Sequence, residues 1–284
     1  MSPAASPQTP LEYPKTRTIV VIPTYNEADN LEKVAREVLK QPAPVDLLIV
    51  DDDSPDGTGR IADALAQSSV SEGRVHVLHR AAKEGLGRAY LAGFAWALAR
   101  DYDAVVEMDA DLSHDPLYLQ TMTEAGRTSD VVIGSRYLNG ISVINWPLRR
   151  ILLSWGANWY VRTVTRLTVN DCTSGYRLYH RRVLEAVDLG SVHSNGYSFQ
   201  VEMTFRAQLA GFQISEVPII FTERRAGQSK LSKGVVWESF VMPLKLRWRE
   251  RTLRRQMEKA PPVPNPGGAG GDIPGTSDSP SIGG

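Results

Sequence analysis

The architecture of the chain is most visible in the segment Thr18-Ile-Val-Val-Ile-Pro-Thr-Tyr-Asn-Glu27. Its first five residues form a continuous apolar run, which is typical of a strand buried on both faces of a sheet. Apolar residues then recur at helical spacing from Leu31 to Leu39, which predicts an amphipathic helix. The turn after the strand lacks the Gly-x-Gly-x-x-Gly pattern, which argues against a dinucleotide-binding dehydrogenase.

The same alternation of strand and helix continues through the first half of the chain. Further strands are expected at 45–50, 74–78, 104–108 and 130–134, and further helices around 61–65 and 87–100. This order predicts an α/β fold with a mostly parallel, doubly wound sheet flanked by helices. Ligands of such folds bind beyond the carboxyl ends of the strands, so we expect the functional residues to lie there.

The second half of the chain is expected to be more helical. Its expected elements are helices over 147–167 and 198–211, a strand over 213–221 with Pro218 near a sheet edge, and a basic helical segment over 235–257 that is interrupted or kinked at Pro243. The domain boundaries that follow are a disordered segment over 1–16, a catalytic domain over 17–233, a basic amphipathic segment over 234–259, and a disordered Pro/Gly-rich tail over 260–284.

Composition excludes several classes of protein. The 284 residues are 42% apolar and 23% charged, which is typical of a globular chain with a core and not of a disordered or collagen-like one. The single cysteine, Cys172, cannot form an internal disulfide and favours a reducing compartment. Residues 1–16 lack the apolar core of a signal peptide, and the best apolar candidate for a membrane span, 151–161, is far shorter than about 20 residues.

The net charge of zero hides an asymmetry between the two halves. Residues 1–143 carry 13 basic and 21 acidic side chains, whereas residues 144–284 carry 19 and 11. This division suggests a cation site in the first half and an anion site in the second. Two solvated faces of opposite charge are the alternative.

Several acidic residues follow the second expected strand, in Asp51-Asp-Asp-Ser-Pro-Asp-Gly-Thr58. Adjacent carboxylates repel one another unless they are neutralised or hydrogen-bonded. One interpretation is a turn at Asp56-Gly57 with Thr58 as a helix cap, and another is a ligand contact by Asp51 or Asp52. Both can hold, because a carboxylate at this edge can accept hydrogen bonds from a nucleobase.

A second acidic motif, Met108-Asp-Ala-Asp-Leu-Ser-His114, follows the fourth expected strand. In an extended segment Asp109 and Asp111 would share a face, and two hard oxygen ligands suit Mg²⁺ or Mn²⁺. A chance repeat in an acidic loop is the alternative. We expect His114 to pack or to donate and accept hydrogen bonds rather than to bind metal.

Candidate anion-binding residues come from three segments. Gly85 and Gly87 open a helix and would allow an anion to approach its backbone N–H groups, although an ordinary turn has the same composition. Gly134-Ser-Arg-Tyr137 places a guanidinium at the same edge of the sheet. Residues 221–230 contain a possible hinge at Gly227 and phosphate-binding charges, or are simply a solvated loop; the basic residues are Arg224, Arg225 and Lys230.

Together, five motifs resemble those of dolichol-phosphate (polyprenol-phosphate) mannose synthases, within the inverting glycosyltransferase family 2. The motifs lie at 23–27, 51–58, 85–90, 108–114 and 134–137, and the resemblance runs from about 18 to 233. It implies a glycosyltransferase-A fold, GDP-mannose as donor, Mg²⁺ or Mn²⁺ as cofactor, a polyprenyl phosphate lipid as acceptor, and a β-linked product formed with inversion. UDP-glucose as donor and a non-catalytic nucleotide-sugar-binding scaffold are the alternatives.

The resemblance also implies site residues. The metal and diphosphate would be bound at Asp109, Ala110 and Asp111, and catalysis would further use the phosphate-contacting residues Arg136, Arg224 and Lys230. The remaining nucleotide-sugar contacts are Pro23, Tyr25, Glu27, Val50, Asp52 and Gln200, and Glu202 is a further candidate. Residues 223–233 could close over the nucleotide as a lid.

Many relatives end in transmembrane hairpins, and no such hairpin is expected within these 284 residues, so the resemblance leaves the membrane anchor open. Residues 144–167 and 224–259 combine tryptophans with basic residues, which suits helices lying in anionic head groups, although core-packed helices with a basic solvated face would look the same. We expect a peripheral protein on the cytoplasmic face of a membrane, or one held there by a small membrane subunit. Nothing resembles a module that reads nucleic acid.

Overall fold

A computed structural model of the chain describes residues 16–68, 71–222 and 233–258. Residues 1–15 and 259–284, on which terminal disorder is expected, lie outside these ranges. So does the proposed lid over 223–233 except for its last residue, and with it Arg224, Arg225, Gly227 and Lys230.

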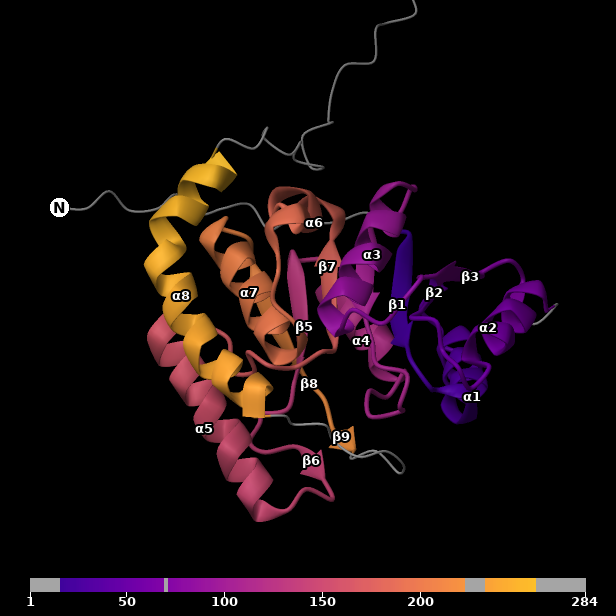
Figure 1. The fold of residues 1–284 in the computed structure, drawn as a ribbon, viewed down its shortest axis with the longest axis horizontal. Coiled ribbons are helices and arrows are strands. Elements are labelled where there is room, and N and C mark those ends of the chain that lie inside the picture. Colours follow the sequence, from indigo (N-terminus) through magenta and orange to yellow (C-terminus); the bar gives the residue numbers. More distant parts are fainter. Residues whose placement is uncertain (1–15, 69–70, 223–232, 259–284) are drawn as a thin grey trace, which may run out of the picture.

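A seven-stranded sheet forms the centre of the fold, with the strand order β3-β2-β1-β4-β7-β5-β8 (Figure 1). Its strands are β1 Thr18–Thr24, β2 Val45–Asp51, β3 Val75–His79, β4 Ala104–Glu107, β5 Val131–Ser135, β7 Arg177–His180 and β8 Ile214–Pro218. β7 runs antiparallel to both of its neighbours, and the other pairings are parallel. The expected α/β class and mostly parallel sheet are confirmed.

Helices cover both faces of the sheet, because alternate residues of its strands point to opposite sides. In β1, Ile19 and Val21 join one hydrophobic core, and Val20 and Ile22 join the other. The first core includes residues of α3 Leu86–Leu98, α6 Arg181–Ala186 and α7 Gly196–Leu209. The second includes residues of α1 Ala28–Leu39, α2 Thr58–Gln67 and α4 Tyr118–Ala125.

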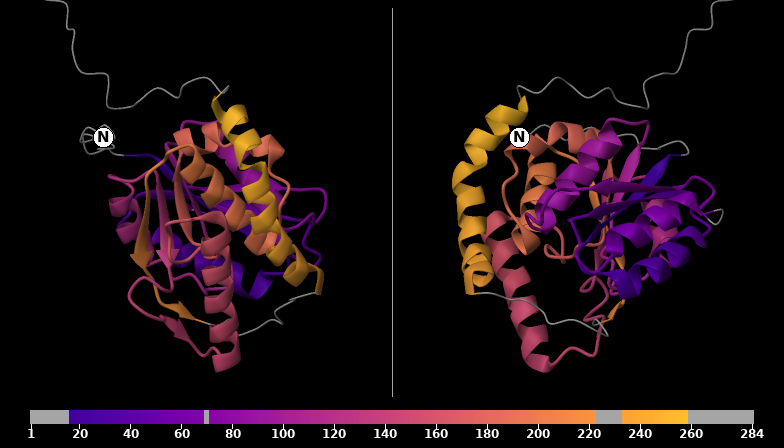
Figure 2. Two further views of the ribbon diagram at one scale, coloured as in Figure 1. Left: turned by 90° about the vertical axis from the view of Figure 1, so that its left-hand side faces the viewer. Right: turned by 45° about the vertical axis from the view of Figure 1, so that its right-hand side comes forward.

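Two long helices, α5 Leu148–Thr165 and α8 Lys233–Glu258, lie side by side at one end of the molecule (Figures 1 and 2). The Tyr160 hydroxyl of α5 donates to the backbone oxygen of Phe240 in α8 at 2.7 Å. Leu246 and Leu253 of α8 are buried in the first core. α8 continues through Pro243, so an interruption at this residue is wrong, whereas a kink there stays a prediction.

The expected strand over 213–221 is divided in the structure. β8 ends at Pro218 as an edge strand, which confirms the expectation for that proline. After two intervening residues, β9 Phe221–Thr222 pairs with β6 Val143–Ile144 in a separate small sheet. Between its gaps, the described chain includes no helix with the length and apolar character that crossing a membrane requires.

Candidate active site

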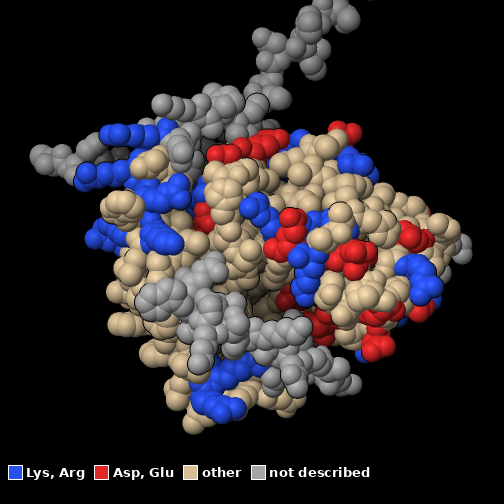
Figure 3. Space-filling view, viewed as in Figure 1, with Lys and Arg blue, Asp and Glu red and all other residues tan. Residues whose placement is uncertain are grey.

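The carboxyl ends of β1, β2 and β4 lie at one edge of the sheet, where the sequence motifs converge. Figure 3 shows a hollow in this face, with acidic side chains at its edge on the side of the first half of the chain. Basic side chains gather over α8, and another group lies over the start of α5. On this face, the basic excess of the second half therefore gathers over α8 and the start of α5, whereas acidic and basic side chains alternate over the first half.

The consecutive aspartates after β2 have separate partners. Asp51 accepts hydrogen bonds from the hydroxyls of Thr24 at 3.2 Å and Ser54 at 2.6 Å, so it fixes the turn. Asp52 accepts from Nη1 of Arg80 at 2.5 Å, and both side chains are nearly buried. Burial raises the pKa of the Asp52 carboxyl, and the ion pair with Arg80 opposes this rise. Of the two candidates, Asp52 is therefore the one suited to a ligand.

Asp56 connects this turn to two helices. Its Oδ1 accepts from the backbone N–H of Thr58 at 3.0 Å, and its Oδ2 accepts from that of Ala28 at 3.1 Å. Gly57, with φ at 92°, is the N-cap of α2, and Thr58 is the first helical residue. The expectation that Thr58 caps the helix is therefore wrong, although the structural role of this turn is confirmed.

The end of β1 brings the expected nucleotide contacts to the same edge. The ammonium group of Lys83 lies 3.7 Å from the centroid of the Tyr25 ring. The backbone N–H of Glu27 donates to the Thr58 hydroxyl at 3.0 Å, which holds the start of α1 against the Asp51–Thr58 turn. Pro23 is half-buried within β1. Val50 is different, since its side chain is fully buried in the core and only its backbone could contact a nucleotide.

Asp109 and Asp111 lie in a tight turn after β4, so the expectation of an extended segment that places both on one face is wrong. The N–H of Asp109 donates to Nδ1 of His114 at 3.1 Å, and the N–H of Ser113 donates to Oδ1 of Asp111 at 3.0 Å. Leu112 completes the turn with φ at 63°. His114 is buried and stacks on Tyr176, as expected for a packing residue.

The donor set of this turn fits a hard divalent cation. Both side chains supply carboxylate oxygens, and Asp111 is nearly buried while Asp109 is partly exposed. Within the described ranges, no group of three or more His, Cys, Asp or Glu residues is arranged to hold a metal. Mg²⁺ and Mn²⁺ commonly bind through one or two carboxylates together with substrate phosphates, and this pair meets that requirement.

Two buried residues, Tyr90 and Glu107, lie next to this turn. The Tyr90 hydroxyl donates to Oδ1 of Asp109 at 3.2 Å. Burial and then the charges of Asp109, Glu107 and Asp111 hold the pKa of Tyr90 well above its ordinary value, so Tyr90 keeps its proton. Glu107 is fully buried at the end of β4, and burial raises its pKa to about 8 despite the opposing effects of Arg177 and Gln200.

Replacing Glu107 with glutamine is expected to weaken the pH dependence of stability. The raised pKa means that between pH 4.5 and about 8 the unfolded chain has lost the Glu107 proton and the folded chain retains it. The free energy of unfolding of the parent protein therefore falls as pH rises, by up to about 1.4 kcal/mol per unit from this group. Urea denaturation of both proteins at pH about 5.5 and about 7.5 should show the variant gaining stability relative to the parent.

The surface residue Glu37 on α1 provides the control, because the hydrogen bond and charge of Lys40 lower its pKa. The Glu37→Gln variant should not gain relative stability over the same pH range. An equal stability difference between Glu107→Gln and the parent at both pH values would contradict the assignment of a protonated Glu107.

Arg136 forms a buried ion pair that the sequence did not reveal. Its Nε and Nη2 donate to the two carboxylate oxygens of Asp171, both at 2.7 Å, and Nη2 also donates to the Thr173 hydroxyl at 2.8 Å. Although burial alone would raise the pKa of the Asp171 carboxyl, Arg136 holds it below its ordinary value. Glu216 of β8 accepts from the N–H groups of Asn170 and Asp171 and fixes this loop. Arg136 was expected to contact phosphate, but most N–H groups of its guanidinium are thus used by structural partners.

The surroundings of four other positions indicate roles that differ from the expected ones. Gln200 is buried and donates to Oε2 of Glu107 at 2.7 Å, and Glu202 accepts from Arg206 and Ser194. A Cβ atom on Gly85 or Gly87 would lie within 2.8 Å of Asn195 or Ser194, respectively. These glycines therefore allow the start of α3 to pack closely against the loop before α7. This close packing, rather than anion binding, explains why glycine is required at the two positions.

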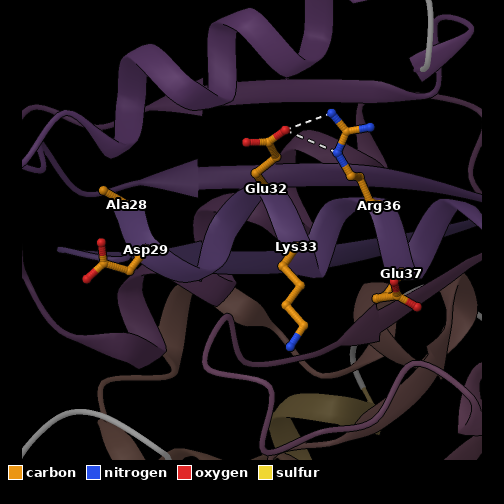
Figure 4. A pocket seen from close by; sticks show the side chains of 6 residues that line it. All are labelled: Ala28, Asp29, Glu32, Lys33, Arg36 and Glu37. Carbon is orange, nitrogen blue, oxygen red and sulfur yellow. Dashed lines mark hydrogen bonds and ion pairs between the residues drawn. The ribbon is translucent and has the colours of Figure 1, made fainter.

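A shallow hollow also lies over the solvent-facing side of α1 (Figure 4). It is lined by Ala28, Asp29, Glu32, Lys33, Arg36 and Glu37. Its Glu32–Arg36 ion pair is half-exposed or more, which is ordinary for a helix surface. We assign it no role in the site.

Comparison with known proteins agrees with this geometry. The sequence pattern described as "Glycosyl transferase family 2" matches residues 19–188, which include β1, the Asp51–Thr58 turn and the Asp109–Asp111 turn. The chain belongs to glycosyl transferase family 2. This glycosyltransferase is 49% identical over 225 residues to the "Undecaprenyl-phosphate mannosyltransferase" of Micrococcus luteus, covering 79% of this chain and 91% of the relative.

A second relative gives the same result. The "Polyprenol monophosphomannose synthase" of Mycolicibacterium smegmatis is 50% identical over 227 residues, covering 80% of this glycosyltransferase and 85% of that protein. The resemblance to polyprenol-phosphate mannose synthases is thereby confirmed. Among solved structures, glucosyl-3-phosphoglycerate synthase from Mycobacterium tuberculosis, in complex with Mn²⁺, uridine-diphosphate-glucose and phosphoglyceric acid, matches with a TM-score of 0.59 at 19% identity. It covers 82% of this chain and 79% of its own, and at this identity it confirms the glycosyltransferase-A fold alone.

Four residues of the site were missed by sequence reasoning. Arg80, Tyr90 and Asp171 each form a hydrogen bond with a residue that a motif had identified. Glu107 accepts a hydrogen bond from the candidate residue Gln200. The only signal for Arg80 and Glu107 was their position at the end of an expected strand, and Tyr90 stood inside a quoted motif. Asp171 is 35 residues from Arg136 and had no signal in the sequence.

Proposed function

We propose that the protein transfers mannose from GDP-mannose to a polyprenyl monophosphate, with inversion, giving GDP and a β-linked polyprenyl phosphate mannose. The observation that carries this proposal is the identity of about one half with two polyprenyl-phosphate mannosyl enzymes over four fifths of the chain. The carboxylate pair at the end of β4 supports an active enzyme over a non-catalytic scaffold, because a scaffold would not need to retain it.

On the donor side, Asp109 and Asp111 would hold Mg²⁺ or Mn²⁺, with Ala110 between them. When bound, such an ion would neutralise charge that develops on the departing diphosphate. Tyr90 orients Asp109 through its hydroxyl, and His114 fixes the backbone of the turn. The remaining nucleotide contacts would come from Pro23, Tyr25, Glu27, the backbone of Val50, and Asp52, whereas Gln200 would act through Glu107.

On the acceptor side, no strong general base is required, because a lipid phosphate already carries a nucleophilic oxygen at neutral pH. Catalysis would then depend on positioning and on charge stabilisation. Arg136, Arg224 and Lys230 would bring two mutually repelling phosphate groups together. A single in-line displacement inverts the sugar carbon.

We further propose that α5 and α8 lie on the cytoplasmic surface of an anionic membrane, where the acceptor's lipid tail remains. Exposed apolar side chains on one side of α5 recur at helical spacing, namely Leu148, Leu152, Trp155 and Trp159. Exposed α8 residues add Phe240, Leu244 and Trp248. Tryptophan, leucine and arginine together suit an interfacial helix. A small membrane subunit covering the same face is the alternative.

Vesicle flotation tests the membrane surface. Exchanging the exposed residues Arg149 and Arg162 of α5 for serine should weaken binding to anionic vesicles by about 30-fold, since each basic residue near such a surface contributes about 1 kcal/mol. The matched control exchanges Lys33 and Arg36 on α1 for serine and should bind like the parent. If the parent itself does not float with anionic vesicles, with or without acceptor, this proposal is wrong, and attachment through a small membrane subunit replaces it.

A donor panel tests the proposed reaction. Purified protein with Mg²⁺ or Mn²⁺ and a short polyprenyl phosphate should transfer label from GDP-mannose far faster than from UDP-glucose, with a product of β configuration. Faster transfer from UDP-glucose would replace the donor assignment. Binding of nucleotide sugars without transfer from any donor would favour the scaffold.

A further inference from the structure

We propose that Arg80 is a specificity-determining residue, and that the Asp52–Arg80 pair recognises guanine by its 2-amino, N1–H and O6 groups. This inference rests on the proposed function, because it concerns the base of the donor nucleotide. It adds a residue outside the family motifs and a definite set of atoms on the base.

The backbones at the ends of three adjacent strands place the pair. The N–H of Asp52 donates to the backbone oxygen of Thr24 at 3.0 Å, and the N–H of Arg80 donates to that of Asp51 at 2.8 Å. These bonds fix the ends of β1, β2 and β3 relative to one another. Asp52 and Arg80 therefore project from a rigid part of the sheet, which suits recognition of a planar ligand.

The hydrogen bonds of the pair leave both an acceptor and donors for a ligand. Oδ1 of Asp52 accepts from Arg80, whereas Oδ2 has no hydrogen-bond partner among the described residues. Arg80 uses one of its five N–H groups on Asp52 and another on Glu84. The side chains of Asp52 and Arg80 are only 5% and 11% exposed, so water cannot satisfy these groups freely.

Asp51 shows the contrast with a purely structural carboxylate. Its two oxygens accept from the Thr24 hydroxyl at the end of β1 and from both the backbone and the hydroxyl of Ser54 in its own turn. Among the described residues, the side chain of Asp52 accepts from no residue of its own turn. Its single strong contact is to Arg80, 28 residues further along the chain.

The neighbouring Tyr25 and Lys83 agree with a base site here. Lys83 lies over the ring of Tyr25 and also exerts an attractive charge on Asp52. An aromatic ring, a carboxylate and two cations therefore meet at the edge where a nucleotide would enter. Such a group can bind the face of a base, its polar edge and the adjoining phosphates.

Guanine matches the pair in the order of its polar groups. Asp52 can accept hydrogen bonds from the N1–H and 2-amino groups of guanine, and O6 of guanine can accept a hydrogen bond from Arg80. Adenine presents the reverse order, with an amino donor at position 6 and an acceptor at N1. Hypoxanthine keeps O6 and N1–H but lacks the 2-amino group. The three purines have the same ring size, so they separate edge recognition from stacking.

Calorimetric titration of the full chain with GDP, IDP, ADP and UDP, each with Mn²⁺, tests the inference. A hydrogen bond to a charged group predicts that GDP binds at least about tenfold more tightly than IDP, and that IDP binds more tightly than ADP. Equal affinities for GDP, IDP and ADP would overturn the inference and leave the proposed donor intact if UDP still binds more weakly. Tighter binding of UDP than of GDP would instead overturn the proposed donor.

The Arg80→Met variant separates base recognition from a general effect of charge. The variant should bind GDP and IDP more weakly than the parent by about the same factor, on the order of tenfold. Its affinity for ADP should be nearly unchanged. The matched control, Arg74→Met, removes the same charge just before β3 rather than after it and should bind all four nucleotides like the parent. Equal weakening of GDP and ADP by Arg80→Met would overturn the inference. The parent titration decides the question even if this variant does not fold.

Discussion

Replacement of Asp111 by asparagine is expected to reduce mannosyl transfer by at least about 100-fold. Asparagine keeps the size of the side chain and an oxygen that can accept the Ser113 N–H, so the turn should persist. It removes one of the two negative charges that would hold a divalent cation beside the diphosphate. The measurement is the initial rate of transfer from labelled GDP-mannose to a short polyprenyl phosphate, with Mg²⁺ or Mn²⁺ varied.

A matched control is available at the opposite edge of the sheet. Asp101 is exposed and precedes β4, whereas Asp111 follows it. The Asp101→Asn variant should keep the activity of the parent. Activity of Asp111→Asn within about tenfold of the parent would remove Asp111 from the metal site.

The second large effect is expected at Asp171. Replacing it with alanine should lower the free energy of unfolding by about 3–5 kcal/mol, because it leaves the guanidinium of Arg136 buried without its counter-charge. The double variant Arg136→Met/Asp171→Leu should recover part of this loss, since apolar side chains can replace a buried ion pair. Urea denaturation of the parent, the single variant and the double variant measures both effects.

An exposed ion pair gives the comparison. Glu32 and Arg36 are paired at 2.7 Å on the surface of α1, and Glu32→Ala should change stability by less than about 1 kcal/mol. A loss of that small size for Asp171→Ala would show that Arg136 finds another partner or water. More N–H groups of Arg136 would then be available to bind phosphate than its contacts in this structure indicate.

The parts of the fold that the sequence predicted are those with a strong local pattern. β1 and β2 are continuous apolar runs between helices, and their boundaries differ from expectation by only a residue or two. β7 was missed because two of its four residues are Arg177 and His180. These polar side chains are buried because Arg177 donates to the backbone oxygens of Ser174, Cys172 and Gln200, and no periodicity could reveal those partners.

The same distinction holds for the site. The Asp52 and Asp109–Asp111 motifs were identified because they follow expected strands, and topology brings strand ends together. Their partners come from distant parts of the chain, as in the pairs Asp52–Arg80 and Arg136–Asp171. The side chain of Val50 lies in the core because it shares the apolar alternation of β2, although a motif position suggested a ligand contact. Local sequence thus indicated a candidate site, and tertiary contacts determine which of its atoms remain for a ligand.

The central claim is that the turn after β4 binds a divalent cation together with the diphosphate of the donor. Anomalous diffraction from crystals of the parent protein grown with Mn²⁺ and GDP tests this claim directly. The account predicts a manganese peak coordinated by carboxylate oxygens of Asp109 and Asp111 and by the diphosphate of GDP. A manganese ion and diphosphate bound together at any other part of the protein would contradict it.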